Sequence, residues 1–232
     1  MSLAVVFSRA SVGIDAPLIT VEVHLANGLP CFNLVGLPEA SVREAKDRVR
    51  SALINSGFEF PARRITVNLA PADLPKEGGR FDLAIAIGII AASNQLAGAS
   101  LNGIELVGEL ALSGEIRSIK GALPFTYACY KAGRIAILPL DNANEAALIS
   151  GAKIVPAGQL LDVFHHLGKQ KSLALFTSDN VAKEAEYEVD LQDVVGQISA
   201  KRALEIAAAG GHNILFTGPP GTGKTMLASR LI

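Results

Sequence analysis

The residues with the clearest chemical capacity are the eight at 218–225, which read Gly-Pro-Pro-Gly-Thr-Gly-Lys-Thr. They fit the pattern G-x-x-x-x-G-K-[ST], in which glycines let a loop curl until its backbone N–H groups point at a phosphate chain. In this pattern Lys224 reaches the β- and γ-phosphates, and the Thr225 hydroxyl is a ligand for Mg²⁺. The pattern therefore predicts ATP and Mg²⁺ as cofactors. The predicted cofactor-binding residues are Gly218, Pro219, Pro220, Gly221, Thr222, Gly223, Lys224, Thr225 and Met226, with Thr225 as the metal ligand.

The elements on either side of this loop favour the same interpretation. The apolar run at 212–217 predicts a strand that leads into the loop, and residues 226–232 predict the opening of a helix. The N-terminus of such a helix adds its dipole to the donors that face a phosphate. The alternative is a turn rich in Gly and Pro with an exposed lysine.

A second stretch, Asp193-Val-Val-Gly-Gln, comes just before a helix predicted over 196–211. It is similar to an acidic-Val-x-Gly-Gln stretch that lies against the adenine in AAA+ ATPases. The resemblance implies adenine contacts for Val194, Val195 and Gly196. The alternative is that Asp193 only caps the helix.

The chain ahead of these segments alternates predicted strands and helices, which indicates an α/β fold. Half of the 232 residues are apolar, 5% are aromatic and none is Trp, so the core must consist of Ala, Val, Ile and Leu. The Asn27-Gly28 pair between two apolar runs predicts a hairpin. Predicted strands cover 4–12, 18–26, 31–37, 64–70, 104–112, 114–119, 134–139 and 152–157. Predicted helices cover 38–57, 81–95, 122–133, 142–150 and 158–168.

Two of these helices have a distinctive pattern. Residues 81–95 are apolar nearly all round, which predicts a deeply buried helix. In the helix at 38–57, Pro38 suits the first turn and Gly57 the position after the last turn. Its predicted buried face consists of Val42, Ala45, Val49, Ala52 and Leu53.

At the level of whole segments the sequence resembles a known family. The stretches from Gly13 to Ile90 and from Lys201 to Leu231 are similar to magnesium-chelatase-like AAA+ proteins of the ComM/YifB group. The resemblance implies a Lon-protease-like domain with the ribosomal protein S5 domain 2-like fold at 1–168. A linker at 169–189 and the beginning of a P-loop AAA+ domain at 190–232 would follow. It further implies a hexameric, DNA-acting ATPase connected with branch migration, competence and recombination.

The resemblance does not carry over every feature of that family. No acidic Walker B cluster, sensor Asn or arginine finger follows the P-loop, so we assign no catalytic residue and expect the front part of a longer protein. Lon-type proteases use a Ser–Lys dyad. The loop at 76–82 has no Ser, and the helix starting at Ala122 lacks the Lys, so we expect no proteolysis. For the Lys76–Arg80 loop two interpretations stay open: an anion or docking site, or a solvated turn with Asp82 starting the helix.

Composition and charge exclude other classes of function. The net charge of −1 gives no general basic field for nucleic acid. The basic residues at 43–50 alternate with acidic ones and indicate an ordinary exposed helix, with phosphate contact as the alternative. Neither a signal peptide nor an apolar run of membrane-spanning length is found, and Cys31 and Cys129 are expected to be buried thiols. The four histidines lack metal-ligand spacing. A cytoplasmic protein without a transition metal or a membrane partner is therefore expected.

Two other functions stay open from the sequence. A metal-chelatase motor subunit would use the same ATPase chemistry to insert Mg²⁺ into a porphyrin, but the long segment ahead of the ATPase module disfavours it. A non-hydrolysing interaction domain is the alternative if the protein ends at Ile232, because a P-loop without its remaining strands has no sheet to hold it.

Overall fold

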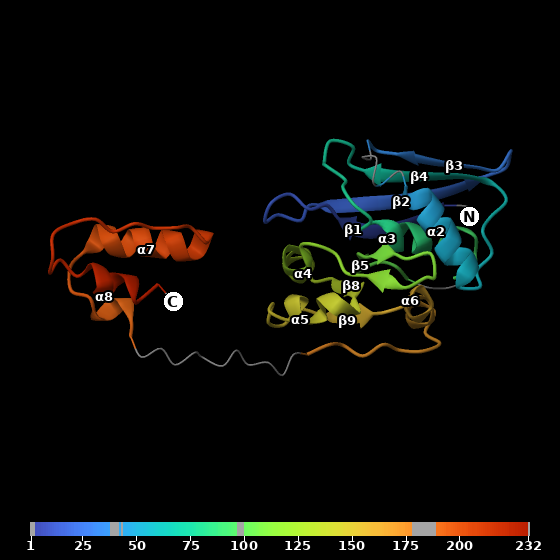
Figure 1. Ribbon diagram of the computed structural model, residues 1–232. Coiled ribbons are helices and arrows are strands. Elements are labelled where there is room, and N and C mark those ends of the chain that lie inside the picture. Colours follow the sequence, from blue (N-terminus) through green and yellow to red (C-terminus); the bar gives the residue numbers. More distant parts are fainter. Residues whose placement is uncertain (1–2, 38–41, 43, 97–99, 178–188, 232) are drawn as a thin grey trace. The chain divides into compact units, whose positions relative to one another are not determined.

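The computed structural model describes residues 3–37, 42, 44–96, 100–177 and 189–231. They form two compact units, Met1–Asp179 and Asn180–Ile232, and each is described separately (Figure 1). The prediction at Pro38 and the basic residue Arg43 lie outside the described residues.

The first unit is an α/β structure around a mixed seven-stranded sheet with the order β3-β4-β2-β1-β5-β8-β9. Four of the six strand pairings are parallel, and β2 is antiparallel to both its neighbours. The strands are β1 (Leu3–Arg9), β2 (Leu18–Ala26), β3 (Cys31–Val35), β4 (Arg64–Ala70), β5 (Ile104–Leu106), β8 (Ile135–Pro139) and β9 (Ile154–Ala157). A separate ribbon pairs β6 (Glu109–Leu110) with β7 (Ile116–Arg117) around Ser113-Gly114, as predicted.

The hairpin predicted at Asn27-Gly28 is wrong. β4 lies between β2 and β3, so these two strands run in opposite directions but do not pair with each other. The hairpin is instead made by β1 and β2, whose connection closes with reciprocal backbone bonds between Val12 and Asp15. The local turn signal indicates a reversal of the chain, but pairing is decided by which strand fills the space beside β2.

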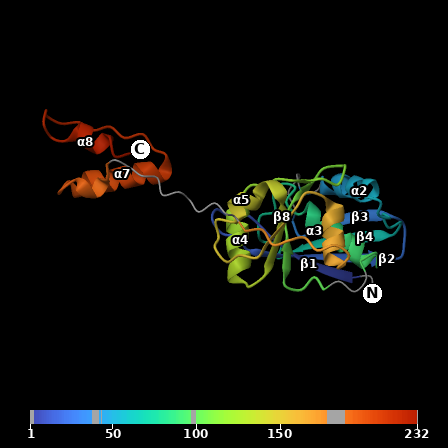
Figure 2. The same cartoon turned by 90° about the horizontal axis from the view of Figure 1, so that it is seen from below.

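Helices cover both faces of the sheet (Figures 1 and 2). They are α2 (Ala45–Asn55), α3 (Asp82–Ala92), α4 (Ala122–Lys131), α5 (Ala143–Ala146) and α6 (Leu160–Leu167), with a short 3₁₀ turn η1 (Leu140–Asn142). Successive residues of β8 alternate between two clusters: Ile137 packs in the core with α3, while Ala136 and Leu138 pack in a second cluster with Phe125 of α4. This alternation follows from the two-residue period of a strand.

The predicted buried elements are confirmed in detail. α3 is buried along almost its whole length, and Val42, Ala45, Val49, Ala52 and Leu53 are all inaccessible to solvent. Gly57, at φ 84°, follows α2 in the left-handed conformation expected after a helix end.

A buried charge cluster ties several elements of this unit together. The carboxylate of Glu105 in β5 accepts hydrogen bonds from Arg9 Nη2 at 2.8 Å, Arg134 Nη1 at 3.1 Å and Cys129 Sγ at 3.0 Å. Burial and the neighbouring carboxylate raise the pKa of the Cys129 thiol. Cys31, in contrast, is exposed at the start of β3, so the prediction that both thiols are buried is wrong for Cys31.

The second unit contains a 3₁₀ turn, η2 (Leu191–Asp193), and the helices α7 (Ile198–Gly210) and α8 (Lys224–Ala228). Its core is small: Val194, Leu204 and Leu227 are buried together, with Ile214 and Phe216 partly covering them. The segment around Val194 thus packs against the helix that follows the glycine-rich loop.

Candidate functional site

The glycine-rich loop at 218–225 curls tightly around the side chain of Lys224. Gly221 and Gly223 have φ values of 80° and 82°, a region that residues with a Cβ rarely adopt. Lys224 is the first residue of α8, and its Nζ donates to the carbonyl oxygens of Gly218 at 3.0 Å and Pro219 at 2.8 Å. Thr222 Oγ1 also donates to the Pro219 oxygen, at 2.9 Å. The loop therefore holds its lysine by its own backbone.

The chemistry of these groups fits a phosphate chain. The Lys224 ammonium supplies a positive charge, its two present acceptors are neutral carbonyls, and a phosphate oxygen is a stronger acceptor than either. The Thr225 side chain belongs to an exposed residue and is open to a ligand. To bind a nucleotide, the Lys224 ammonium would have to exchange its two carbonyl contacts for contacts with phosphate oxygens.

The strand predicted at 212–217 is not formed, and no other strand occurs in the described part of the second unit, residues 189–231. A strand needs a neighbour to satisfy its backbone N–H and C=O groups. Residues 212–217 pair with no strand among the described residues, and Ile214 and Phe216 pack on the small core instead. The prediction of a helix after the loop is confirmed, although α8 has only five residues.

The residues predicted to contact adenine have different environments. Val194 is 2% exposed and packs with Leu204 and Leu227, whereas Val195 is 94% exposed. Gly196 has a φ of 72°, and Gln197, also with a positive φ, is the N-cap residue just before α7. The alternative role proposed for Asp193, capping α7, is therefore wrong. Asp193 instead completes a capping box with Asp190 around η2.

Sequence reasoning missed Arg230, which connects the two parts of this site. Its Nε donates to the Asp190 carbonyl at 2.7 Å, and its Nη1 donates to the Met226 carbonyl at 2.7 Å. Its Nη2 lies 3.6 Å from the Asp193 carboxylate, and the side chain is only 12% exposed. Arg230 thus fastens the segment that begins at Asp190 to the end of α8. The only signal in the sequence was a basic residue near a helix C-terminus.

In the first unit, the interpretation of Lys76–Arg80 as a turn with solvated charges is wrong for Lys76 and Arg80, although Glu77 is exposed. Lys76 is fully buried, its ammonium donates to the carbonyls of Pro71 and Leu74, and burial lowers its pKa. Arg80 is 7% exposed. The part of that interpretation that concerns Asp82 holds, because Asp82 starts α3.

Two of the basic residues at 43–50, Arg48 and Arg50, make contacts within the protein. Arg48 forks onto the Asp82 carboxylate at 2.7 and 3.2 Å and lies 3.6 Å from Glu44. The Arg50 guanidinium lies over the ring of Phe60, 5.3 Å from its centroid. These contacts favour the structural interpretation of this helix over phosphate binding.

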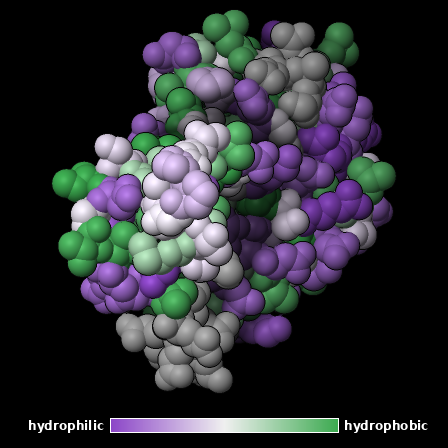
Figure 3. Space-filling model, turned by 60° about the vertical axis from the view of Figure 1, so that its left-hand side comes forward, coloured by the Kyte–Doolittle hydropathy of each residue, from purple (hydrophilic) through white to green (hydrophobic). Residues whose placement is uncertain are grey.

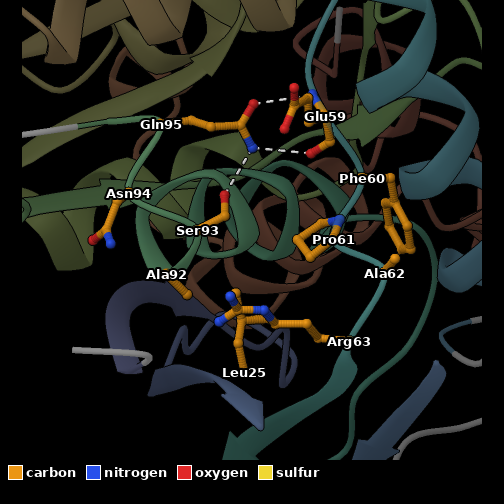
Figure 4. A pocket seen from close by; sticks show the side chains of 10 residues that line it. All are labelled: Leu25, Glu59, Phe60, Pro61, Ala62, Arg63, Ala92, Ser93, Asn94 and Gln95. Carbon is orange, nitrogen blue, oxygen red and sulfur yellow. Dashed lines mark hydrogen bonds between the residues drawn. The ribbon is translucent and has the colours of Figure 1, made fainter. Parts of the chain in front are cut away.

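A hollow of about 650 Å³ in the first unit lies beside the end of α3 (Figure 4). Gln95 bridges its walls: Nε2 donates to the Glu59 carbonyl at 2.9 Å, and Oε1 accepts from the Glu59 N–H at 3.0 Å. Ser93 Oγ accepts a further bond from Gln95 at 2.7 Å. These bonds use the backbone of Glu59, so its carboxylate and the side chains of Arg63 and Asn94, which also line the hollow, take no part in them.

No group of three or more His, Cys, Asp or Glu suited to a metal ion occurs among the described residues. His165 and His166 bond separately, to Gln170 and to the Leu173 N–H. Within the described ranges no helix is long and apolar enough to cross a bilayer. On the face shown in Figure 3, apolar side chains lie between hydrophilic ones and form no continuous apolar surface.

Comparison of the sequence with known proteins shows the family of this chain. A family model described as subunit ChlI of Mg-chelatase matches residues 21–142, and one described as magnesium chelatase, subunit ChlI, matches residues 190–232. Among curated proteins, competence protein ComM of Haemophilus influenzae is 59% identical over the whole chain. The uncharacterized YifB proteins of Salmonella typhimurium and Escherichia coli are each 54% identical over the whole chain. The chain spans 46% of the length of each of these three relatives. With a family model that covers more than half of its residues, the chain belongs to the magnesium-chelatase subunit ChlI family, as a magnesium-chelatase-like protein of the ComM/YifB type.

Proposed function

We propose that this chain is the nucleotide-binding front part of a magnesium-chelatase-like ATPase, and that the complete protein is a cytoplasmic, hexameric motor acting on DNA. The observation that carries the proposal is the Gly218–Thr225 loop with Lys224 at its centre, inside the segment matched by the magnesium-chelatase family model. The DNA part rests on the 59% identity to a protein named for competence, the uptake of DNA by bacterial cells.

In this proposal the residues of the second unit have separate tasks. Lys224 would exchange the Gly218 and Pro219 carbonyls for the β- and γ-phosphates, and the Thr225 hydroxyl would be a ligand of Mg²⁺. The exposed Val195 and Gly196 contact the adenine, and Val194 anchors this segment in the core. Arg230 keeps the adenine segment attached to α8. Bound MgATP supplies the phosphoanhydride bond whose hydrolysis drives the complete motor.

Nucleotide titration of the purified protein tests the first step. We expect Lys224→Ala to weaken MgATP binding by about 10- to 100-fold, because each charge-assisted hydrogen bond contributes about 1.5–3 kcal/mol. Lys201→Ala in α7 is the matched control, since it removes a lysine from the same unit outside the loop. Equal MgATP affinity of the Lys224→Ala and Lys201→Ala proteins would contradict the proposal.

A metal-chelatase motor subunit is the second candidate. Both matching family models carry the chelatase name, and one of them covers residues 21–142, so this segment alone does not separate the two functions. ATPase assays of the complete protein do separate them. Stimulation by branched DNA supports the proposed motor, whereas stimulation only by a porphyrin-binding partner supports the chelatase.

A further inference from the structure

A second hollow of the first unit, about 470 Å³, has a buried arginine in its wall. It lies between the loop ahead of α3 and the connection from β7 to α4. The polar residues that line it are Ser11, Glu77, Arg80, Glu109, Ser118 and Lys120. Most of them lie in exposed positions at its rim, whereas Arg80 is 7% exposed.

Arg80 differs from Arg9 and Arg48 in that two nitrogens of its guanidinium have no acceptor among the described residues. Its Nε and Nη2 are shielded from solvent and have no hydrogen-bond partner among the described residues. Arg9 and Arg48 are each held by a carboxylate, that of Glu105 and that of Asp82. Burial lowers the pKa of Arg80. A buried charge without a partner is costly, which makes Arg80 receptive to an anion.

The charges at the rim limit which anion fits. Lys120 adds a second positive charge, and the Ser11 and Ser118 hydroxyls add donors. Glu77 and Glu109 also line the hollow, so a polyanion lying across it would meet two carboxylates. The charge of Glu109 raises the pKa values of Arg48 and Asp82. A compact ligand with one oxyanion group brings less negative charge near these two carboxylates than a polyanion does.

We propose that this hollow binds the carboxylate or phosphate group of a small ligand, with Arg80 as its principal partner and Lys120, Ser11 and Ser118 at its rim. The volume lies in the range of small-molecule pockets, about 300–1,000 Å³. This site is separate from the glycine-rich loop and does not depend on the function proposed for that loop.

The test uses inorganic phosphate and succinate as probes, titrated into the whole chain with Lys224→Ala introduced, so that the glycine-rich loop is weakened as a phosphate site. Binding is followed by calorimetry and by the NMR signal of the Arg80 Nε–H group. We expect at least one probe to shift this signal and Arg80→Met to weaken its binding by about tenfold or more. Lys120→Ser, which changes an exposed side chain, should weaken it several-fold, and Arg63→Met outside the hollow should not change it.

A readout of stability keeps the test valid if binding is weak. Arg80→Met removes an unpartnered buried charge, so it should raise the melting temperature of the free protein, and the probe should raise that of the parent protein but not of the variant. Absence of binding by both probes, or equal binding by the Arg80→Met protein, would overturn the proposal. The proposal would also be overturned if a short DNA duplex shifted the Arg80 signal and neither small probe shifted it.

Discussion

The pair formed by Arg48 and Asp82 shows at the residue scale how burial competes with ion pairing. Asp82 is 1% exposed, and burial raises its pKa to about 6 although Arg48 and the Leu110 N–H both stabilise its charged form. The folded protein therefore holds this proton more tightly than the unfolded chain does. The contribution of Asp82 to stability is fully present below about pH 4 and is lost as the pH rises through about 6.

The direction of this pH dependence gives a prediction for the Asp82→Asn variant. The asparagine side chain keeps an oxygen for Arg48 and for the Leu110 N–H but does not ionise. The free energy of unfolding of the variant minus that of the parent should increase by about 3 kcal/mol between about pH 4 and pH 7, from about 1.4 kcal/mol for each unit of pKa shift. Urea denaturation followed by circular dichroism measures it, with Asp15→Asn in the exposed β1–β2 turn as the control. A difference that stays constant with pH would contradict the raised pKa of Asp82.

Two loops, at 218–225 and at 76–80, show which residues could be assigned from the sequence and which could not. The loop at 218–225 was recognisable because its function requires fixed residue types at fixed spacing. The burial of Lys76 and Arg80 could not be predicted from the sequence, because charged side chains next to two glycines are usually solvated. Only the tertiary structure shows that Lys76 finds two carbonyls and that Arg80 finds no acceptor for its Nε and Nη2 among the described residues.

At the scale of elements, periodicity predicted local structure better than pairing. β2 and β4 have the bounds predicted from their apolar runs, and α3 is buried as its composition required. The position of β4 between β2 and β3 was not predicted, because the Asn27-Gly28 pair indicates only that the chain reverses its direction. The strand at 212–217 was wrongly predicted for a related reason: its apolar pattern is that of a strand, but pairing needs a neighbour.

The contact of α3 with the sheet depends on Gly88. A Cβ at this position would lie 2.6 Å from Cγ2 of the buried Val23, and β-branched valine has little freedom to move. Gly88→Ala should therefore lower the free energy of unfolding by about 1–3 kcal/mol, even though alanine favours helices. Gly158→Ala is the matched control, because no atom lies within 4 Å of its added Cβ. Chemical denaturation measures both, and equal effects would contradict this packing.

At the scale of the whole molecule, the two units differ in how much core each contains. The first unit has two hydrophobic clusters on the two faces of its sheet, whereas the cluster in the described part of the second unit is built on Val194, Leu204 and Leu227 alone. A core of that size gives little stability by itself. We therefore expect the cooperative unfolding of the chain to report mainly on the first unit.

The end of the first unit gives the last prediction. The sequence places residues 169–177 in the linker, but the Phe176 N–H donates to the Ile154 carbonyl at 2.8 Å, and the Phe176 ring packs on the second cluster. Leu173 packs on the main core, and its N–H donates to His166 Nδ1 at 3.0 Å.

A chain that stops after Gly168 loses these contacts, whereas one that stops after Asp179 keeps them. From the partial burial of one Leu and one Phe we expect the shorter chain to be less stable by about 2 kcal/mol. Its melting temperature should therefore be lower by about 4–8 °C. Phe176→Ala in the longer chain should give part of this decrease, and equal melting temperatures of the two truncated chains would show that residues 169–177 contribute no stability.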